Sequence, residues 1–316
     1  MKLARFRTGE RECIGAVEGD QVVDLRAALT AAMMGAGMSH DQAAAEAAER
    51  IPGNMREFLA GGGPLLQVAH EAVAFAHAYP DHLLAGQPIS YPLASTPLLC
   101  PIGDPQKIIC VGQNYRDHCE EQNQPLPERA IIFAKFASAL THPGAPILLP
   151  KASEKVDYEA ELAFVIGKRA KHVSEEDAKD YVAGYMCFDD VSARDIQMHP
   201  AEKQWIRGKS PDTFAPCGPY LVTADEIADP HDLDIQLTLN GEVMQKSNTS
   251  NLIFGVYYLV SHLSKTMTLE PGDIVATGTP GGVGAFRNPP VWLKPGDEVS
   301  VAIEGLGTLT NPVAAE

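Results

Sequence analysis

The chain has 316 residues, 45% of them hydrophobic and 21% charged, which is enough for a globular protein with a full hydrophobic core. Its formal charge of -16 at pH 7 excludes nucleic acid and anionic membrane surfaces as main partners, because both select basic surfaces. The N-terminus has no apolar leader-like stretch, and no segment approaches the ~20 uncharged apolar residues of a membrane span. The six cysteines form no CxxC pair, so we expect reduced thiols and a cytoplasmic protein.

The first part of the chain predicts short strands followed by helices. Residues 1–27 contain the strand-like runs "KLARFRTG", "CIGAVEG" and "QVVDL". An Ala-rich helical stretch follows over residues 25–50 and is interrupted near Gly35, and a second helical stretch covers residues 64–79. Residues 90–106 are rich in proline and predict a linker.

Beyond the linker, the pattern changes to many short strands separated by turn residues. Strand-like runs include "KIICVG", "ELAFVIG", "YVAGYMCFDDV", "LDIQLTLNGEVMQ", "GDIVATG" and "GDEVSVAIEGLGTLTNPV". Only a few helices interrupt this pattern, such as "EEDAKDYV" and "NLIFGVYYLVSHLSKT". The sequence therefore predicts an α+β, β-rich protein in two parts, with a β-rich second part that carries the chemistry.

The segment "VDYEAELAFVIG", residues 156–167, combines apolar residues with three regularly spaced acids. Asp157, Glu159 and Glu161 fall at every second position, so an extended chain directs all three carboxylates to one face. Aligned carboxylates in a covered strand are costly unless they are paired or bind a metal. A solvated acidic face is the alternative interpretation.

A second acidic pair strengthens the metal interpretation. Asp189 and Asp190 end the apolar run of "GYMCFDDV", where a strand passes into a loop. Carboxylates from two strands suit a hard cation such as Mg²⁺ or Mn²⁺, which leaves coordination positions open to substrate. Because neighbouring residues of an extended chain face opposite sides, we expect Asp189 to be a hydrogen-bonded structural acid.

Five motifs occur in one order over residues 105–313: "VGQNYRDHCEE", "VDYEAEL", "DDVSARD", "RGKSPDTFAPCGP" and "VATGTPGGVG". Together they closely resemble the fumarylacetoacetate hydrolase family. The resemblance implies a small N-terminal accessory domain over residues 1–100, a catalytic domain over residues 101–316 built as a mixed β-sheet roll or sandwich, and a homodimer. It implies that Glu159, Glu161 and Asp190 are the metal ligands, whereas Asp157 is expected to pair with a nearby cation or to cap the edge of the site.

The resemblance also implies a catalytic dyad. His118 and Glu121 are three residues apart on a helix and therefore share a face, so the carboxylate can orient the imidazole as a general base. In the family such a dyad lies on a lid, and the polar segment after it, "EEQNQPLPE", is consistent with a mobile loop. The alternative is a surface salt bridge. Glu120 is expected to lie off the face of His118.

Further residues are assigned by their positions in the family motifs. Lys209 resembles the active-site lysine that stabilises a developing oxyanion, and a desolvated lysine can also lose its proton. Arg194 and Gln197 match positions near the metal or the substrate carboxylate, although an ion pair with a neighbouring aspartate is an equal alternative for Arg194. Thr279 lies in a glycine-rich loop that lets backbone approach a ligand, and we expect it to bind the substrate carboxylate.

These residues favour a Mg²⁺-dependent hydrolase that cleaves a C–C bond in a 2,4-dioxo acid of the acylpyruvate or fumarylpyruvate type, giving pyruvate plus an acid. Such an enzyme belongs to the catabolism of aromatic or sugar-acid compounds. The alternative enzymes on the same metal site are an isomerase of a 2-hydroxyhepta-2,4-diene-1,7-dioate-type substrate and a decarboxylase of oxaloacetate. A third hypothesis, a binding module with structural Ca²⁺, leaves most calcium positions unfilled and gives Lys209 and His118 no purpose.

Overall fold

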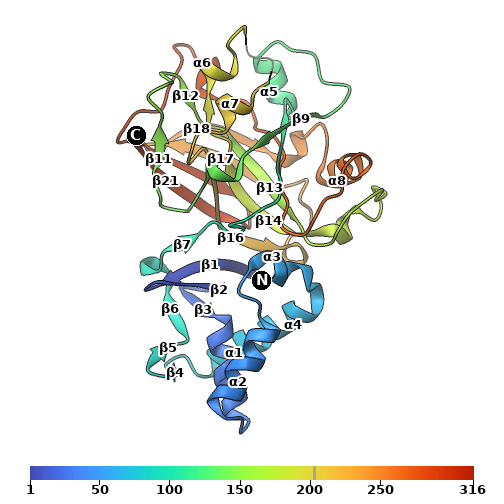
Figure 1. Ribbon diagram of the computed structural model, residues 1–316. Coiled ribbons are helices and arrows are strands. Elements are labelled where there is room, and N and C mark those ends of the chain that lie inside the picture. The colour runs from blue at the N-terminus through green and yellow to red at the C-terminus, as the bar shows by residue number, and fades with distance from the viewer. Residues whose placement is uncertain (202–203) are drawn as a thin grey trace.

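The computed structural model describes residues 1–201 and 204–316. Its N-terminal part contains short strands and four helices (Figure 1). These elements are β1 (Lys2–Thr8), β2 (Arg11–Glu18), β3 (Gln21–Asp24), α1 (Leu25–Gly35), α2 (His40–Arg50), α3 (Met55–Ala60), α4 (Gly62–Ala78), β4 (Leu83–Leu84), β5 (Gln87–Pro88), β6 (Ser90–Pro92) and β7 (Leu98–Leu99). The predicted strands and helices are confirmed here, whereas α3 was not predicted and the predicted linker contributes β6 and β7.

The rest of the chain is dominated by strands. They are β8 (Ile108–Gly112), β9 (Ile131–Lys135), β10 (Leu140–Thr141), β11 (Ile147–Leu149), β12 (Val156–Asp157), β13 (Ala160–Ile166), β14 (Val182–Asp189), β15 (Ser192–Ala193), β16 (Ala215–Thr223), β17 (Asp234–Leu239), β18 (Glu242–Asn248), β19 (Ile274–Ala276), β20 (Glu298–Ile303) and β21 (Gly307–Ala315). The helices are α5 (Arg116–Glu121), α6 (Arg194–Gln197), α7 (Ile206–Lys209) and α8 (Val256–Ser264). The predicted α+β, β-rich class is confirmed.

Two sheets form the framework. The larger sheet has twelve strands, with the main order β6-β3-β2-β1-β16-β14-β13-β19-β8-β9, and the smaller has the order β11-β21-β20-β17-β18. Strands β13, β14 and β16 of the larger sheet contact β17, β20 and β21 of the smaller one, so the two sheets pack as a sandwich. The β17–β18 hairpin turns at Asn240 and Gly241, which both have positive φ, as the "NG" signal predicts.

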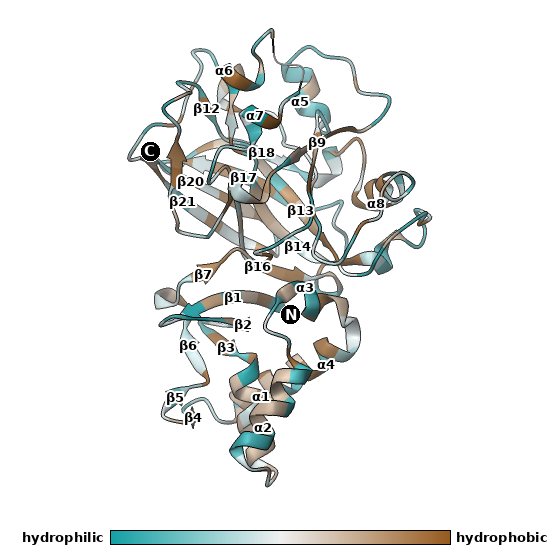
Figure 2. Ribbon diagram, viewed as in Figure 1, coloured by the Kyte–Doolittle hydropathy of each residue, from teal (hydrophilic) through white to brown (hydrophobic). Residues whose placement is uncertain are grey.

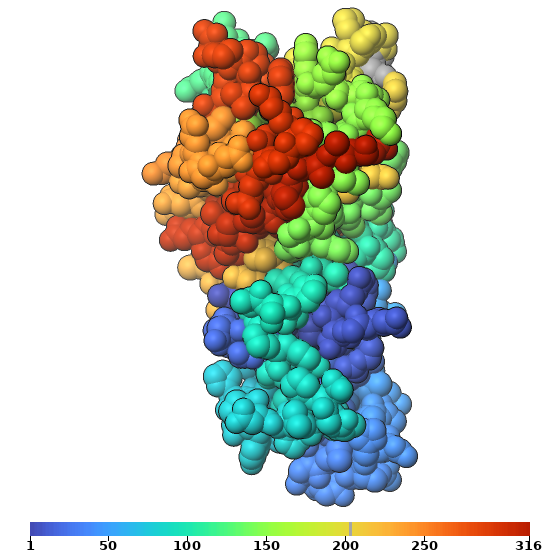
Figure 3. Space-filling model, turned by 90° about the vertical axis from the view of Figure 1, so that its left-hand side faces the viewer, coloured from blue at the N-terminus to red at the C-terminus, as the bar shows by residue number. Residues whose placement is uncertain are grey.

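The larger sheet runs across residue 100. Strand β1 pairs with β16 in antiparallel register, with Leu3 opposite Leu221, so the N-terminal residues extend the sheet of the later ones. Figure 3 shows residues 1–100, blue through cyan, gathered in one half of the molecule. The division at residue 100 into accessory and catalytic domains stays a prediction.

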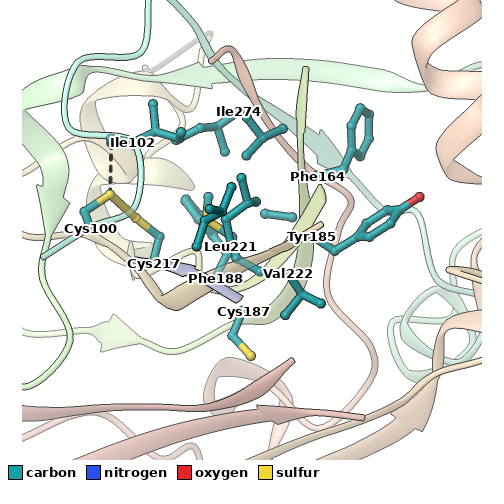
Figure 4. Packing of buried hydrophobic residues seen from close by; sticks show 14 of the residues in the cluster. Cys100, Ile102, Phe164, Tyr185, Cys187, Phe188, Cys217, Leu221, Val222 and Ile274 are labelled. Carbon is teal, nitrogen blue, oxygen red and sulfur yellow. Dashed lines mark hydrogen bonds between the residues drawn. A yellow bond between two sulfur atoms is a disulfide. The ribbon is translucent and has the colours of Figure 1, made fainter. Parts of the chain in front are cut away.

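The core joins both parts of the chain. Strand β13 is buried along its whole length, because both of its faces are covered. Figure 4 shows Phe164 of β13 beside Tyr185 of β14 and Leu221 of β16. By contrast, α2 buries only two alanines and is largely polar outside (Figure 2). No helix in the described ranges has the length and apolarity needed to cross a membrane.

Two predictions about local structure are wrong. Residues 175–182 do not form an α-helix, and only Ala178–Tyr181 make a 3-10 turn, because the chain must enter β14 at Val182. Cys100 and Cys217 form a disulfide, drawn in Figure 4, rather than two reduced thiols. The two cysteines are 117 positions apart, and only the fold brings them together.

Candidate metal centre and active site

Three buried carboxylates meet where β13 and β14 lie side by side. Glu161 is in β13, Glu159 precedes that strand, and Asp190 follows β14. Because Ala160 pairs with Asp189 across the two antiparallel strands, the three acids lie at one end of the pair. One oxygen from each carboxylate lies within 4.8 Å of the others. Their exposed fractions are 5% or less, so water does not neutralise their mutual repulsion.

The backbone around the cluster is fixed by hydrogen bonds. The Asp190 amide donates to the Glu159 carbonyl over 2.9 Å, and the Glu159 amide donates to Asp189 Oδ1 over 2.9 Å. The Asp189 side chain thus holds Glu159 in place. Its other oxygen has no hydrogen-bond partner in the described part of the chain, and burial raises the pKa of Asp189 to about 7.

Two lysines contact the cluster directly. Lys209 Nζ donates to Glu159 Oε2 over 2.7 Å and to Asp190 Oδ2 over 2.8 Å, while Lys135 Nζ donates to Asp190 Oδ1 over 2.6 Å. Burial alone lowers the pKa of Lys209, but the Asp190 and Glu159 carboxylates outweigh it and raise that pKa above its ordinary value. These contacts favour the protonated form of Lys209, and its role in the reaction stays a prediction.

Arg194 links the edge of the cluster to the glycine-rich loop. Its Nε donates to Asp157 Oδ2 over 2.8 Å, and its guanidinium lies 2.6 Å from Glu159 Oε1. Asp157 also accepts from the Gly284 and Ala285 amides, over 2.7 and 3.0 Å. The expected cation partner of Asp157 is thus Arg194. For Arg194, this contact is the structural ion pair that was one of its two predicted roles. Its contact with substrate stays a prediction, as does that of Gln197, whose Oε1 accepts from Arg194 over 3.1 Å.

The charges in the cluster fit a divalent cation. Burial raises the pKa of Glu159, but the Lys209 ammonium and the Arg194 guanidinium outweigh it and lower the pKa to about 2. Glu161 lacks a cation partner among the described residues and accepts only the Gly278 amide, over 2.8 Å. Burial, together with Asp190 and Glu159, raises its pKa well above the ordinary value. A cation bound by three carboxylate oxygens would relieve this repulsion, and hard oxygen ligands are those that Mg²⁺ and Mn²⁺ prefer.

The predicted dyad lies on the short helix α5. His118 Nδ1 is 3.3 Å from Glu121 Oε2, and the amide of Gly282 donates to both Glu121 oxygens, over 3.0 and 3.1 Å. On the other side of the ring, Gln122 Nε2 lies 2.6 Å from His118 Nε2. His118 is only 6% exposed, whereas Glu120 is exposed. The geometry suits an oriented imidazole, and its catalytic role stays a prediction.

The cluster and the dyad open into one cavity of about 160 Å³. It is lined by Val111, Gly112, Gln113, His118, Gln122, Phe133, Glu159, Glu161, Arg194, Gln197, Met198, Trp205, Lys209, Thr279 and Phe286. Of the predicted site residues, the cavity thus gathers all except Glu121 and Asp190, which lie directly behind it. The Thr279 hydroxyl accepts from Gln245 Nε2 over 2.8 Å, so its predicted contact with substrate is still untested.

Sequence reasoning missed several residues of this site. Lys135 was the most informative of them, because a lysine at the end of the apolar run "IIFAKF" is 3% exposed and must have a buried partner. Gln113 lies inside the motif "VGQNYRDHCEE" and Gln122 directly follows it, but neither carries a charge that would draw attention. Phe133 and Trp205 form apolar wall, and only the fold brings them to the cavity.

The chain is similar to known proteins along most of its length. The sequence model of the family described as fumarylacetoacetate (FAA) hydrolase C-terminal matches residues 107–314. The chain is 51% identical over 263 residues to the mitochondrial oxaloacetate tautomerase fahd2 of Xenopus laevis, covering 83% of this chain and 79% of that one. Relatives named mitochondrial also come from Bos taurus and Homo sapiens.

Two solved structures cover the whole fold. The fumarylacetoacetate hydrolase of Exiguobacterium antarcticum has a TM-score of 0.79 at 32% identity, over 100% of both chains. Maleylpyruvate hydrolase of Sphingobium sp. SYK-6, in complex with manganese(II) and pyruvate, has a TM-score of 0.74 at 31% identity, over 100% of this chain and 99% of that one.

The relatives named mitochondrial overturn the predicted cytoplasmic location. That prediction was based on cysteine spacing and on the lack of an apolar leader. Neither property distinguishes the cytosol from the interior of an organelle, since organelle transit peptides are amphipathic rather than apolar.

Proposed function

Because the chain belongs to the fumarylacetoacetate hydrolase family, we propose that it is an oxaloacetate tautomerase. The proposed enzyme interconverts the keto and enol forms of this four-carbon 2-oxo diacid with a divalent cation, Mg²⁺ or Mn²⁺. Glu159, Glu161 and Asp190 are the proposed ligands, and His118, Glu121 and Lys209 the proposed catalytic residues. The proposal rests on one observation above all: two of the three clustered carboxylates, Glu159 and Glu161, line a single small cavity together with Lys209 and His118.

The size of the cavity supports a small substrate. Its volume of about 160 Å³ is well below the roughly 300–1,000 Å³ of sites for drug-sized ligands. A four-carbon acid suits this space better than an acylpyruvate with a long acyl chain. Phe133 and Trp205 on the cavity wall exclude water from the polar end.

A bound divalent cation would supply Lewis-acid polarisation of the 2-oxo group. The chain contributes a second positive charge through Lys209. An ammonium has three donors, and Glu159 and Asp190 accept two of them, so one N–H of Lys209 remains for the substrate oxygen. Negative charge develops on that oxygen as the enol forms, and a fixed buried donor stabilises it more than water does.

His118 is the proposed proton carrier. In the keto-to-enol direction His118 Nε2 takes a proton from C3, the C3–H electron pair becomes the C2–C3 double bond, and the C2=O π pair moves onto the C2 oxygen, which then receives the proton held by the imidazolium. Glu121 holds Nδ1–H and stabilises the imidazolium, which then returns its proton. No water is consumed, and no C–C bond breaks. The reverse path gives the keto form.

The relatives favour this reaction over C–C hydrolysis, which sequence analysis ranked first. The chain is 51% identical to a protein named oxaloacetate tautomerase and 31% identical to one named maleylpyruvate hydrolase. The predicted alternative, an isomerase or oxaloacetate decarboxylase on the same metal site, is therefore closer than the hydrolase. Decarboxylation starts from the same polarised 2-oxo acid and remains a second candidate. A homodimer and a role in the catabolism of aromatic or sugar acids stay predictions.

The test compares three reactions of the purified chain with Mg²⁺ or Mn²⁺. We expect rapid loss of the enol absorbance of oxaloacetate, slow release of CO₂, and no cleavage of acetylpyruvate. Excess EDTA is expected to abolish the tautomerisation, and added Mn²⁺ to restore it. Cleavage of acetylpyruvate at a higher kcat/KM than tautomerisation would overturn the proposal and return the hydrolase.

His118→Ala separates chemistry from metal binding. We expect kcat to fall about 10²–10⁴-fold, because a positioned general base contributes that much, while the affinity for Mn²⁺ stays unchanged. Calorimetric titration with Mn²⁺ provides the second measurement. An equal loss of metal affinity would make His118 part of the metal site rather than a proton carrier.

A further inference from the structure

Two glutamines flank the dyad helix α5 and line the cavity. Gln113 lies just after β8, and Gln122 is the C-terminal capping residue of α5. Both are half-buried. They are nine positions apart, with His118 between them, and the fold brings both side chains to the cavity that contains the carboxylate cluster.

Gln113 has an unusual backbone. Its φ of 52° is in the left-handed region, which residues other than glycine rarely adopt. Such conformations persist only where the surrounding structure imposes them, and they concentrate at ligand sites. The Gln113 side-chain amide has no hydrogen-bond partner among residues 1–201 and 204–316, so its donors and its acceptor are free for a ligand.

Gln122 has spare donor capacity as well. Its Nε2 lies 2.6 Å from His118 Nε2, and a carboxamide carries two N–H groups. One N–H is directed at His118 Nε2 in the substrate-free chain and must leave that nitrogen when it takes the substrate proton, so both N–H groups and Oε1 of Gln122 are then open to a ligand. A ligand that contacts His118 therefore also lies near the Gln122 side chain.

The cations of the cavity have no free donor for a second carboxylate, because the one N–H of Lys209 that does not bind the cluster is the proposed donor to the 2-oxo oxygen. Arg194 and Lys209 are the only lysine or arginine side chains that line it among the described residues, and both are paired with carboxylates of the cluster. A substrate with a second carboxylate, remote from its 2-oxo acid group, needs other donors. Neutral amides provide such donors without adding a buried charge. Their hydrogen bonds to a carboxylate are strong, because a hydrogen bond to a charged group is stronger than one between neutral groups.

We propose that Gln113 and Gln122 are specificity-determining residues, whose side-chain amides bind the distal carboxylate of the substrate. This inference rests on the proposed function, since it takes oxaloacetate as the substrate and assigns the two glutamines to the end remote from its 2-oxo group. The pair makes the enzyme selective for 2-oxo diacids over 2-oxo monoacids. Pyruvate is the matched probe, because it is oxaloacetate without the distal carboxylate.

The experiment measures the Kd of oxaloacetate and of pyruvate in saturating Mg²⁺, from the fluorescence of Trp205 on the cavity wall. The variants are Gln113→Leu, Gln122→Leu and their combination. Each single variant is expected to weaken oxaloacetate about tenfold, the loss for one hydrogen bond to a charged group, and to change pyruvate less than twofold. Gln124→Leu, an exposed glutamine just beyond α5, serves as the control and is expected to change neither.

Unchanged pyruvate binding also reports that each variant is folded. Equal weakening of both ligands, or no weakening of oxaloacetate, would overturn the inference. A different result would contradict the proposed function alone. In that case the unsubstituted chain would bind oxaloacetate more tightly than pyruvate, and this preference would depend on Gln113 and Gln122, but the chain would not accelerate the tautomerisation of oxaloacetate.

Discussion

Glu159 joins the cluster to both Lys209 and Arg194 and belongs to the proposed metal site. Glu159→Ala leaves Lys209 and Arg194 each with one carboxylate fewer in a buried environment. We expect Mn²⁺ affinity to fall more than about 100-fold and the free energy of unfolding to drop by about 3–5 kcal/mol, the cost of breaking a buried pair from one side. Calorimetry and denaturant unfolding measure the two effects. Glu120→Ala, at an exposed acid, is the control. Retained Mn²⁺ affinity in Glu159→Ala would refute the ligand assignment.

Substitution of Lys135 is expected to change Mn²⁺ affinity and the stability of the metal-free protein in opposite directions. Its ammonium is fully buried against Asp190 and donates also to the Val191 carbonyl over 3.0 Å. Lys135→Met removes a positive charge beside the proposed ion, so Mn²⁺ should bind more tightly, while the metal-free protein loses about 3 kcal/mol of stability. Thermal melts with and without Mn²⁺ are expected to show a lower Tm without metal and a larger rise on adding it. The exposed Lys171→Met should change neither, and a smaller rise in Lys135→Met would contradict the assignment.

At the scale of residues, the sequence predicted the chemistry of the site better than its contacts. Alternating acids in an apolar, covered segment favour a buried anionic cluster over a solvated face, because buried carboxylates must be paired or bind a metal. The pairing of Arg194 with Asp157, and of Lys135 with Asp190, joins residues 37 and 55 positions apart. Such pairs follow from strand order, which local patterns do not contain.

At the scale of elements, the acidic segment is two strands rather than one. Asp157 ends β12, which pairs with β15, whereas β13 starts at Ala160 and pairs with β14 and β19. The break at residues 158–159 lets Asp157 meet Arg194 while Glu159 and Glu161 face the cluster. Acids at every second position predict that Asp157, Glu159 and Glu161 share one face. They do not predict the change of partner strand that separates Asp157 from the other two.

The junction before β8 carries a pH-dependent contact. The Cys100 amide donates to His142 Nδ1 over 3.1 Å, so the folded chain needs this nitrogen without a proton. Burial, together with Arg5 and Arg7, lowers the pKa of His142. The unfolded chain therefore binds a proton more readily, and stability is lost as the pH falls below about 6.5 towards the folded pKa.

His142→Asn tests this contact by removing the titrating group. Between about pH 7.5 and pH 5.5, the Tm of the unsubstituted chain is expected to fall about 1–3 °C more than that of the variant, a modest effect because the ring is only half-buried. His77→Asn, at an exposed histidine of α4, should follow the unsubstituted chain. If the Tm of the His142 variant and of the unsubstituted chain changed identically with pH, the contact between His142 and Cys100 would not contribute to the pH dependence of stability.

At the scale of the whole molecule, the sheet passes through the predicted boundary at residue 100. Composition predicts two parts, because the Pro-rich segment separates a helix-rich region from a strand-rich one. It does not predict that β1 pairs with β16, since the two strands are more than 200 positions apart. Leu3 of β1 is fully buried in the core cluster that also contains Leu221 and Val222 of β16, so residues 1–100 cover surface that belongs to the rest of the chain.

Deleting residues 1–100 should therefore destabilise the remainder, although the proposed site lies wholly within residues 101–316. Loss of β1 leaves one edge of β16 without its backbone partner and exposes the apolar residues that β1 covers, which favours aggregation. We expect the fragment 101–316 to be insoluble alone, and soluble with recovered Mn²⁺ affinity when residues 1–100 are co-expressed as a separate chain. A soluble fragment that melts at the Tm of the full chain would instead establish the predicted boundary as that of an independently folding domain.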